Sequence, residues 1–218
     1  RDLRMSRGLG DVYKRQHCKI GDRDVTVSVR TQYPYGSGIE IKVKTDSDDP
    51  FTLALRLPKH TFLNRMTVDG APAHEVLEKG YLKLKRNWKG ETVVSILLDI
   101  PVLRIYANPK VRADIGRVAL VKGPVVYCLE EADNGANLGG FELPDDAALR
   151  EEYDNTLFGG TMTITAEGVK VVDDGNASLY RTTPPKKEKA VMKFVPYCYW
   201  NNRGKGEMLV WVRREIKY

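Results

Sequence analysis

Hydrophobic and polar residues alternate in short runs along the chain after residue 17. In residues 39–44 every second residue is isoleucine or valine and the residues between them are charged; residues 51–57 show the same period. A period of two places apolar side chains on one face of a β-strand and polar side chains on the other. We therefore predict that these two runs form neighbouring half-buried strands, followed by strands at 81–85 and 92–98.

A second group of predicted strands occupies the rest of the chain. Residues 125–130 are rich in valine and other apolar residues, which predicts a strand buried on both faces. Gly168 interrupts an alternating pattern, so we expect separate strands on its two sides. Residues 145–153 form the one predicted short helix. The other predicted strands are 117–121, 161–165, 169–172 and a closing hairpin of 190–199 with 207–213.

Many short strands, turn residues between them and almost no helix indicate an all-β fold. We predict two consecutive antiparallel β-sandwich domains, covering residues 17–107 and 108–218. The length of 218 residues suits one large or two small domains.

Residues 1–16 lack this periodicity and are treated separately. Residues 11–16, DVYKRQ, match the translation of the transposase mosaic-end adaptor of sequencing libraries. Such a segment is excluded from fold reasoning. We predict that residues 1–16 are an adaptor-derived, disordered scar and that the chain is a gene fragment.

Charge and hydropathy argue against nucleic-acid and membrane partners. The chain has 35 basic and 29 acidic residues, and residues 1–16 hold five of the basic and two of the acidic ones. Half of the net charge of +6 therefore lies in the predicted scar, and the other basic residues are interspersed with acidic ones, unlike a nucleic-acid-binding stripe. The longest apolar stretch, residues 93–103, contains Ser95, Asp99 and Pro101 and is shorter than a membrane helix of about 20 residues.

No catalytic or metal-binding constellation is predicted in this chain. The three histidines, His17, His60 and His74, lack metal-ligand spacing. The carboxylate pairs at 130–131 and 145–146 consist of sequence neighbours, which point to opposite faces of a strand, so we interpret both as solvated. Of the three cysteines, which lack C-x-x-C spacing, we expect Cys128 and Cys198 to be buried as small apolar residues.

Exposed aromatic residues are the remaining candidates for ligand binding, because sugar rings stack their C–H faces on tryptophan and tyrosine. Aromatic residues are dense at 33–35 and 197–200. Alternation along a strand would place Tyr197 and Tyr199 opposite Trp200. The candidate sugar-binding residues are Tyr33, Tyr35, Trp88 and Trp200. The alternative role for these residues is core or rim packing.

Several strings resemble the β-L-arabinofuranosidase-like glycoside hydrolase family 127. The most specific is GRVALVKGPVVYCLE at 116–130. The others are 32–36, 80–82, 86–88, 100–102, 108–111, 133–134, 157–160, 196–197, 200–204 and 206–211. The resemblance covers nearly everything after His17.

The resemblance implies that the chain is the C-terminal, noncatalytic part of a larger enzyme with an (α/α)₆ catalytic barrel that hydrolyses bonds of arabinose-containing glycans. The family's cysteine nucleophile, zinc and glutamate acid/base lie in that barrel and match no position here; Cys128 therefore does not inherit the nucleophile's role. The implied partners are the missing barrel and the glycan substrate, and we expect no cofactor in this chain and no activity from it alone. A soluble bacterial protein of the cytoplasm or periplasm is expected; the alternative function is an independent carbohydrate-binding module.

Overall fold

The computed structural model describes residues 12–46, 48–73, 76–173, 175 and 178–215. The chain separates into two compact units, Arg1–Pro101 and Val102–Tyr218, which we call unit 1 and unit 2. Both are β domains, which confirms the all-β prediction. The boundary lies earlier than the predicted one between residues 107 and 108, because strand β10 (Val102–Ile105) pairs with β11 (Arg117–Lys122) of unit 2.

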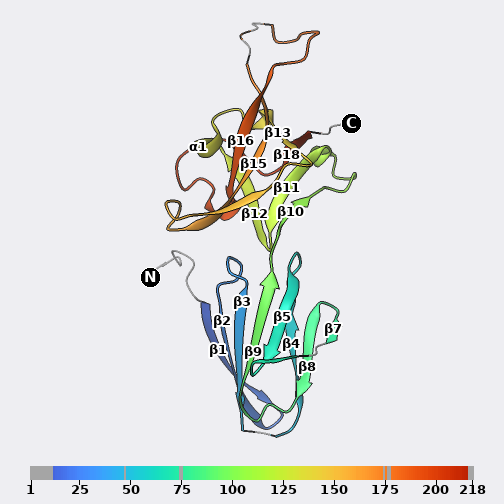
Figure 1. Ribbon diagram of the computed structural model, residues 1–218, viewed down its shortest axis with the longest axis vertical. Helices are drawn as coiled ribbons and strands as arrows, with labels where there is room; N and C mark the ends of the chain where they lie inside the picture. Colours follow the sequence, from blue (N-terminus) through green and yellow to red (C-terminus); the bar gives the residue numbers. More distant parts are fainter. Residues whose placement is uncertain (1–11, 47, 74–75, 174, 176–177, 216–218) are drawn as a thin grey trace. The chain divides into compact units, whose positions relative to one another are not determined.

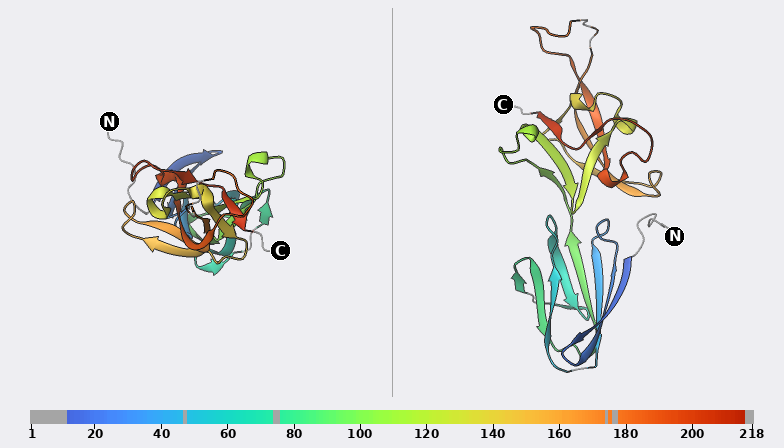
Figure 2. Two further views of the ribbon diagram at one scale, coloured as in Figure 1. Left: turned by 90° about the horizontal axis from the view of Figure 1, so that it is seen from above. Right: turned by 180° about the vertical axis from the view of Figure 1, so that it is seen from behind.

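Unit 1 consists of two antiparallel sheets that share one hydrophobic core (Figure 1; from behind, Figure 2). The larger sheet has the order β1-β2-β3-β9-β5-β6 and the smaller sheet the order β4-β8-β7. Two sheets enclosing a core in this way form a sandwich. The strands are β1 (Val12–Ile20), β2 (Arg23–Thr31), β3 (Gly38–Thr45), β4 (Phe51–Arg56), β5 (Phe62–Val68), β6 (Ala71–Pro72), β7 (Val76–Glu78), β8 (Tyr81–Arg86) and β9 (Gly90–Asp99).

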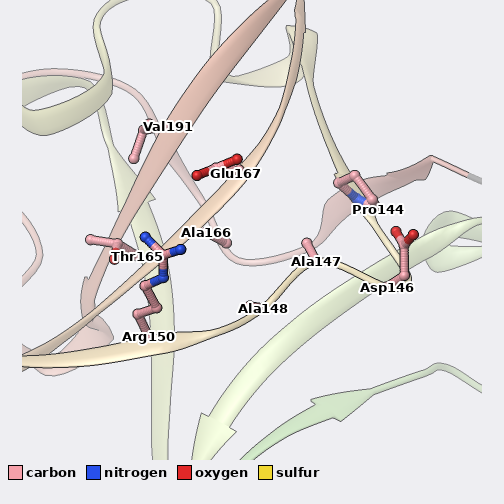
Figure 3. A pocket seen from close by; sticks show the side chains of 9 residues that line it. All are labelled: Pro144, Asp146, Ala147, Ala148, Arg150, Thr165, Ala166, Glu167 and Val191. Atoms are coloured by element: carbon pink, nitrogen blue, oxygen red, sulfur yellow. The ribbon is translucent and has the colours of Figure 1, made fainter.

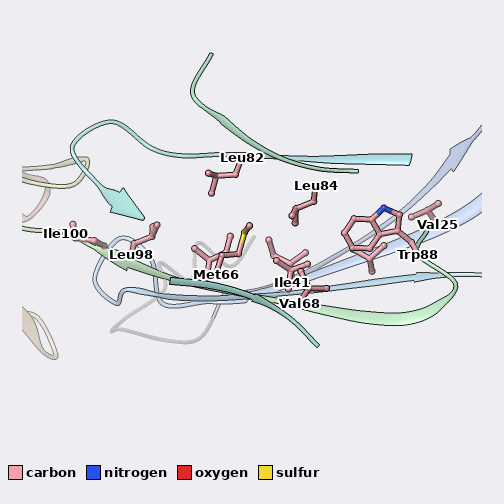
Figure 4. Close-up of a cluster of buried hydrophobic side chains, with 12 residues drawn as sticks. Val25, Ile41, Met66, Val68, Leu82, Leu84, Trp88, Leu98 and Ile100 are labelled. Atoms are coloured by element: carbon pink, nitrogen blue, oxygen red, sulfur yellow. The ribbon is translucent and has the colours of Figure 1, made fainter. Parts of the chain in front are cut away.

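Alternation along the strands builds the core of unit 1. In β9 the side chains of Val94, Ile96 and Leu98 are buried. Leu82 and Leu84 of β8, in the smaller sheet, face Met66 and Ile41 of the larger sheet (Figure 4). The expectation that 39–44 and 51–57 form neighbouring strands is wrong: β3 pairs with β2 and β9, whereas β4 pairs with β8. Alternation specifies which face of a strand is buried. It does not specify the sheet, because a strand in either sheet of a sandwich turns its apolar face toward the same core.

Part of the predicted N-terminal scar belongs to a strand. Residues 12–16, predicted to be disordered, form the first half of β1, which pairs with β2 from Val12 opposite Thr31 to Ile20 opposite Arg23. Side chains 13–19 are all exposed, so the main-chain ladder is the chief link between β1 and β2. Side-chain hydrogen bonds of Tyr13 with Ser28 and of His17 with Thr26 add to it. Residues 1–11 of the predicted scar lie outside the described residues.

Unit 2 is one nine-stranded sheet that closes on itself. The strand order is β10-β11-β18-β13-β15-β16-β12-β17, β14 pairs with β15, and β11 also pairs with β12, which completes the ring. The interior holds a separate core that includes Tyr127, Phe141 and Phe194. The further strands are β12 (Val125–Glu130), β13 (Phe141–Pro144), β14 (Arg150–Asp154), β15 (Thr161–Val171), β16 (Lys187–Pro196), β17 (Met208–Leu209) and β18 (Val212–Glu215), with α1 (Glu131–Asn134) and the 3₁₀ turns Arg112–Asp114, Leu138–Gly140 and Tyr197–Tyr199.

Two local predictions for unit 2 are wrong. The predicted hairpin of 190–199 with 207–213 does not form, because β12 lies between β16 and β17, and β18 pairs with β11 and β13. The predicted helix at 145–153 is replaced by β14, whose backbone pairs with β15. In both places long-range strand pairing decides the structure, and a local pattern does not reveal it.

Gly168 lies inside one continuous strand rather than between two. β15 runs from Thr161 to Val171, and a Cβ added at Gly168 would lie 2.5 Å from the carbonyl oxygen of Glu142, 2.5 Å from Cε of Met192 and 3.2 Å from Cδ of Pro144. A glycine within a strand often marks such a close approach. Here it lets β13 and β16 pack against β15.

Replacing Gly168 with alanine is expected to lower the free energy of unfolding by about 1–3 kcal/mol, because the methyl group overpacks this crossing. Urea denaturation followed by circular dichroism measures the loss. Gly139 is the matched control, since a Cβ there meets nothing within 4 Å, and Gly139→Ala should change stability by no more than about 0.5 kcal/mol. Equal losses in the two variants would contradict the close approach.

Candidate functional site

Trp88 is a core residue and not a sugar-stacking platform. Its side chain is 0% exposed, its Nε1–H donates a hydrogen bond of 2.9 Å to the carbonyl oxygen of Phe51, and the two rings stack with centroids 5.5 Å apart. The ring lies within the buried cluster of unit 1 (Figure 4). The prediction of Trp88 as a sugar-binding residue is therefore wrong, because the loop before β9 turns the indole inward.

Tyr33 and Tyr35 do not form an exposed platform either. Both are half-buried, and Tyr33 packs against the core of unit 1, where burial raises the pKa of its hydroxyl. A turn sets the backbone here, with Tyr35 N–H donating to the carbonyl oxygen of Gln32 at 2.9 Å. A hollow of about 600 Å³ beside this turn is lined by Gln32 and Gly36 but by neither tyrosine.

Trp200 is exposed and shares its side of the chain with Tyr197. The two side chains are 43% and 44% exposed, and their rings lie 6.1 Å apart between centroids at an interplanar angle of 17°. Strand alternation would have separated them, but Tyr197–Tyr199 is a 3₁₀ turn with Trp200 as its C-cap. Three residues per turn bring positions i and i+3 to the same side.

A buried carboxylate anchors the loop that carries Trp200. Glu130, at the end of β12, is 5% exposed and accepts a hydrogen bond of 3.0 Å from the backbone N–H of Asn201. The guanidinium of Arg203 donates to Glu130 and, at 2.8 Å through Nη1, to Asp133 of α1. The interpretation of Glu130 as solvated is wrong, because Arg203, 73 positions later in the chain, pairs with its buried carboxylate.

The same arginine links the anchor to a second aromatic pair. Its guanidinium carbon lies 5.3 Å from the ring centroid of Phe158, which stacks on Tyr199 at 4.3 Å and 8°. The hydrogen bond to Asp133, followed by that to Glu130, raises the pKa of Arg203 above its usual value despite partial burial. Arg203 therefore stays cationic between its two carboxylates.

A further pair of contacts holds the end of the loop. Glu207 N–H donates to Oε2 of Glu131 at 2.8 Å, and the carboxylate of Glu207 accepts a 2.7 Å hydrogen bond from the backbone N–H of Leu138. The sequence did not single out Glu130, Arg203 or Tyr197 as site residues. The only signal was the density of aromatic and turn residues at 197–206, because the ion pairs join segments far apart in the chain.

The cysteines have different environments. Cys128 of β12 is 0% exposed, and burial raises the pKa of its thiol to about 12. A thiol that stays protonated at neutral pH is a poor nucleophile. Cys198, expected to be buried, is exposed, because the 3₁₀ turn replaces the predicted strand and directs it outward; Cys18 of β1 is also exposed.

No metal-binding cluster emerges among the described residues. No three His, Cys, Asp or Glu side chains of this part of the chain lie close enough together to hold a metal ion, and His74 lies outside the described residues. A pocket of about 310 Å³ in unit 2 is lined by the charged residues Asp146, Arg150 and Glu167 and by several alanines (Figure 3). Its lining includes no histidine, cysteine or aromatic ring. Within the described residues no helix has the length and apolar character to cross a membrane.

The two units match consecutive domains of one family. Residues 10–100 match the β-L-arabinofuranosidase GH127 middle domain, and residues 102–213 match the glycoside hydrolase family 127 C-terminal domain. The chain is 35% identical over 202 residues to a non-reducing end β-L-arabinofuranosidase of Bifidobacterium longum subsp. longum, covering 87% of this chain and 30% of that protein.

Solved structures show the same relation. A GH127 β-L-arabinofuranosidase from Geobacillus stearothermophilus T6 superposes with a TM-score of 0.84 at 37% identity, covering 92% of this chain and 32% of that one. A GH127 β-arabinofuranosidase superposes with a TM-score of 0.80 at 26% identity, covering 93% and 34%. The chain therefore spans about a third of the length of these relatives.

Proposed function

Because the chain belongs to glycoside hydrolase family 127 and comprises its middle and C-terminal domains, we propose that it is the noncatalytic β-domain portion of an enzyme that hydrolyses glycosidic bonds of arabinose-containing glycans. The observation that carries the proposal is the coincidence of two boundaries. The matched domains meet at residues 100–102, and the structure divides at Pro101. Unit 1 therefore corresponds to the matched middle domain and unit 2 to the matched C-terminal domain.

The chemistry of the described residues supports a noncatalytic role. Glycoside hydrolysis needs a carboxylate pair, or a nucleophile with a separate acid, held around one bond. Glu130 and Asp133 are engaged with Arg203, and the Cys128 thiol is buried and protonated. In the proposal the nucleophile, the acid/base and any zinc belong to the catalytic barrel, which this chain does not contain, and the two β domains pack against that barrel as its partner.

Direct assay tests the first half of the proposal. The 218-residue chain, incubated with an aryl β-L-arabinofuranoside, is expected to release no aryl alcohol above the buffer rate. The full-length Geobacillus stearothermophilus relative, under the same conditions, is the positive control. Hydrolysis that co-purifies with the chain through two chromatographic steps would contradict a noncatalytic role.

A chimera tests the second half. Units 1 and 2 replace the corresponding third of the Geobacillus stearothermophilus enzyme, to which they are 37% identical. The chimera is expected to be soluble and to hydrolyse the same substrate, because β domains of one family should support the same barrel. A folded chimera without activity would show that these domains do not serve a β-L-arabinofuranosidase barrel.

A further inference from the structure

We propose that Tyr197 and Trp200 form a glycan-contact surface, which we call the Tyr197–Trp200 platform. The two rings are almost equally exposed, 44% and 43%, and are inclined to each other by only 17°. Aromatic faces attract the slightly positive edges of C–H groups. The rings stack on each other with centroids 6.1 Å apart, and the exposed outer faces of this stack can pack against sugar residues.

The platform is held rigidly before any ligand arrives. Trp200 N–H donates to the carbonyl oxygen of Tyr197 at 3.0 Å, which closes the 3₁₀ turn, and the next residue is fixed by the buried carboxylate of Glu130. Arg203 ties the following turn to β12 and α1. Ordering a loop on binding costs free energy. When the loop is already ordered, this cost is not subtracted from the weak stacking interaction, and the affinity is higher.

A second pair of aromatic rings, distinct from the exposed pair, has a structural role. Tyr199 is half-buried and stacks on Phe158, with the Arg203 guanidinium over the Phe158 ring. This second pair supports the loop, so Tyr197 and Trp200 are not needed for that purpose. Their exposed faces are therefore available to contact a ligand.

Polar groups at the edges of the platform complete the chemistry that sugars require. Within the described part of the chain, no hydrogen bond engages the hydroxyl of Tyr197, the Nε1–H of Trp200, the side-chain amide of Asn201 or the ammonium of Lys205. Trp200 and Lys205 also border a small hollow together with Glu131 and Glu207. Sugar hydroxyls both donate and accept hydrogen bonds, and this rim offers both kinds of partner.

A sugar fits this surface better than a protein partner. Protein interfaces need a continuous apolar core of several hundred Å². The exposed neighbours of the two rings in residues 201–207 are Asn, Gly, Lys and Glu. The platform itself is independent of the proposed function, but the choice of an arabinose-containing glycan as its ligand rests on that function.

Affinity electrophoresis tests the platform in the intact chain. In native gels containing arabinan, the chain is expected to migrate more slowly than in plain gels. Trp200→Ala and Tyr197→Ala should each weaken the apparent affinity roughly 2- to 10-fold, the range expected for losing one aromatic contact. Tyr180→Ala, at a 92% exposed tyrosine of the same unit, is the matched control and should bind like the parent chain.

Each other outcome overturns the proposal. Unretarded migration of the parent chain, or equal retardation of Trp200→Ala with an unchanged circular dichroism spectrum, removes the platform. Equal retardation by xylan removes the arabinose-containing ligand class, and Trp200-dependent self-association in size-exclusion chromatography assigns the rings to a protein contact. None of these readouts measures hydrolysis, so failure here is distinguishable from failure of the catalytic proposal, which the assay and the chimera test.

Discussion

Replacing Arg203 with alanine is expected to lower the free energy of unfolding of unit 2 by about 3–5 kcal/mol, the typical cost of removing one partner from a buried ion pair. The guanidinium is shared by Glu130 and Asp133, whose side chains are 7% and 10% exposed. Without it, two carboxylates stay close together and poorly hydrated at the junction of β12 and α1. The large effect therefore comes from the charges left behind, together with the loss of the contact to Phe158.

Urea denaturation at neutral pH measures this loss, and Arg214 provides the matched control. Arg214 also forms a two-pronged pair, with Asp145 at 2.9 and 2.6 Å, but its partner's side chain is 39% exposed. A solvated pair contributes little, so Arg214→Ala should cost no more than about 1 kcal/mol. Similar losses for the two variants would show that burial of Glu130 is not what makes the Arg203 contact important.

Strand positions in this protein could be predicted where one face of a strand is buried. The alternation in β3 and β9 specifies Ile41, Val43, Val94 and Ile96 as core residues, and all four are buried. The pattern does not specify partners. β4 has the same alternation as β3 but belongs to the other sheet, and β18 reaches β13 in a parallel pairing that no local turn announces.

The candidate site was only partly predictable, for two physical reasons. Trp200 was selected because aromatic residues are dense around it. Tyr197 was placed on the opposite side of the chain, because strand alternation has a period of two residues, whereas the 3₁₀ turn that forms here has a period of three. The anchoring ion pairs join residues 130 and 133 to residue 203, and no spacing rule connects positions so far apart. The resemblance to the family, by contrast, rests on continuous strings such as residues 116–130, which form β11 and β12. Such a string can be recognised in the sequence without knowing which strands pair with it.

The burial of Trp88 leads to the second large effect. Trp88→Ala is expected to lower the free energy of unfolding by about 3–5 kcal/mol, because it removes the largest fully buried side chain of unit 1 and leaves a cavity beside Phe51. Trp88→Phe keeps most of the ring but leaves the carbonyl oxygen of Phe51 without its indole donor, so a smaller loss of about 1–3 kcal/mol is expected.

Trp200→Ala is the matched control for Trp88→Ala, because it removes the same side chain from an exposed position, and it should alter stability by no more than about 0.5 kcal/mol. The two tryptophans are thus expected to have opposite effects in two measurements. Trp88 variants lose stability in urea denaturation and retain arabinan binding, whereas Trp200→Ala binds arabinan more weakly and retains stability. Weakened arabinan binding by a fully folded Trp88→Phe variant would contradict the assignment of Trp88 to the core, since an indole that is 0% exposed cannot touch a sugar.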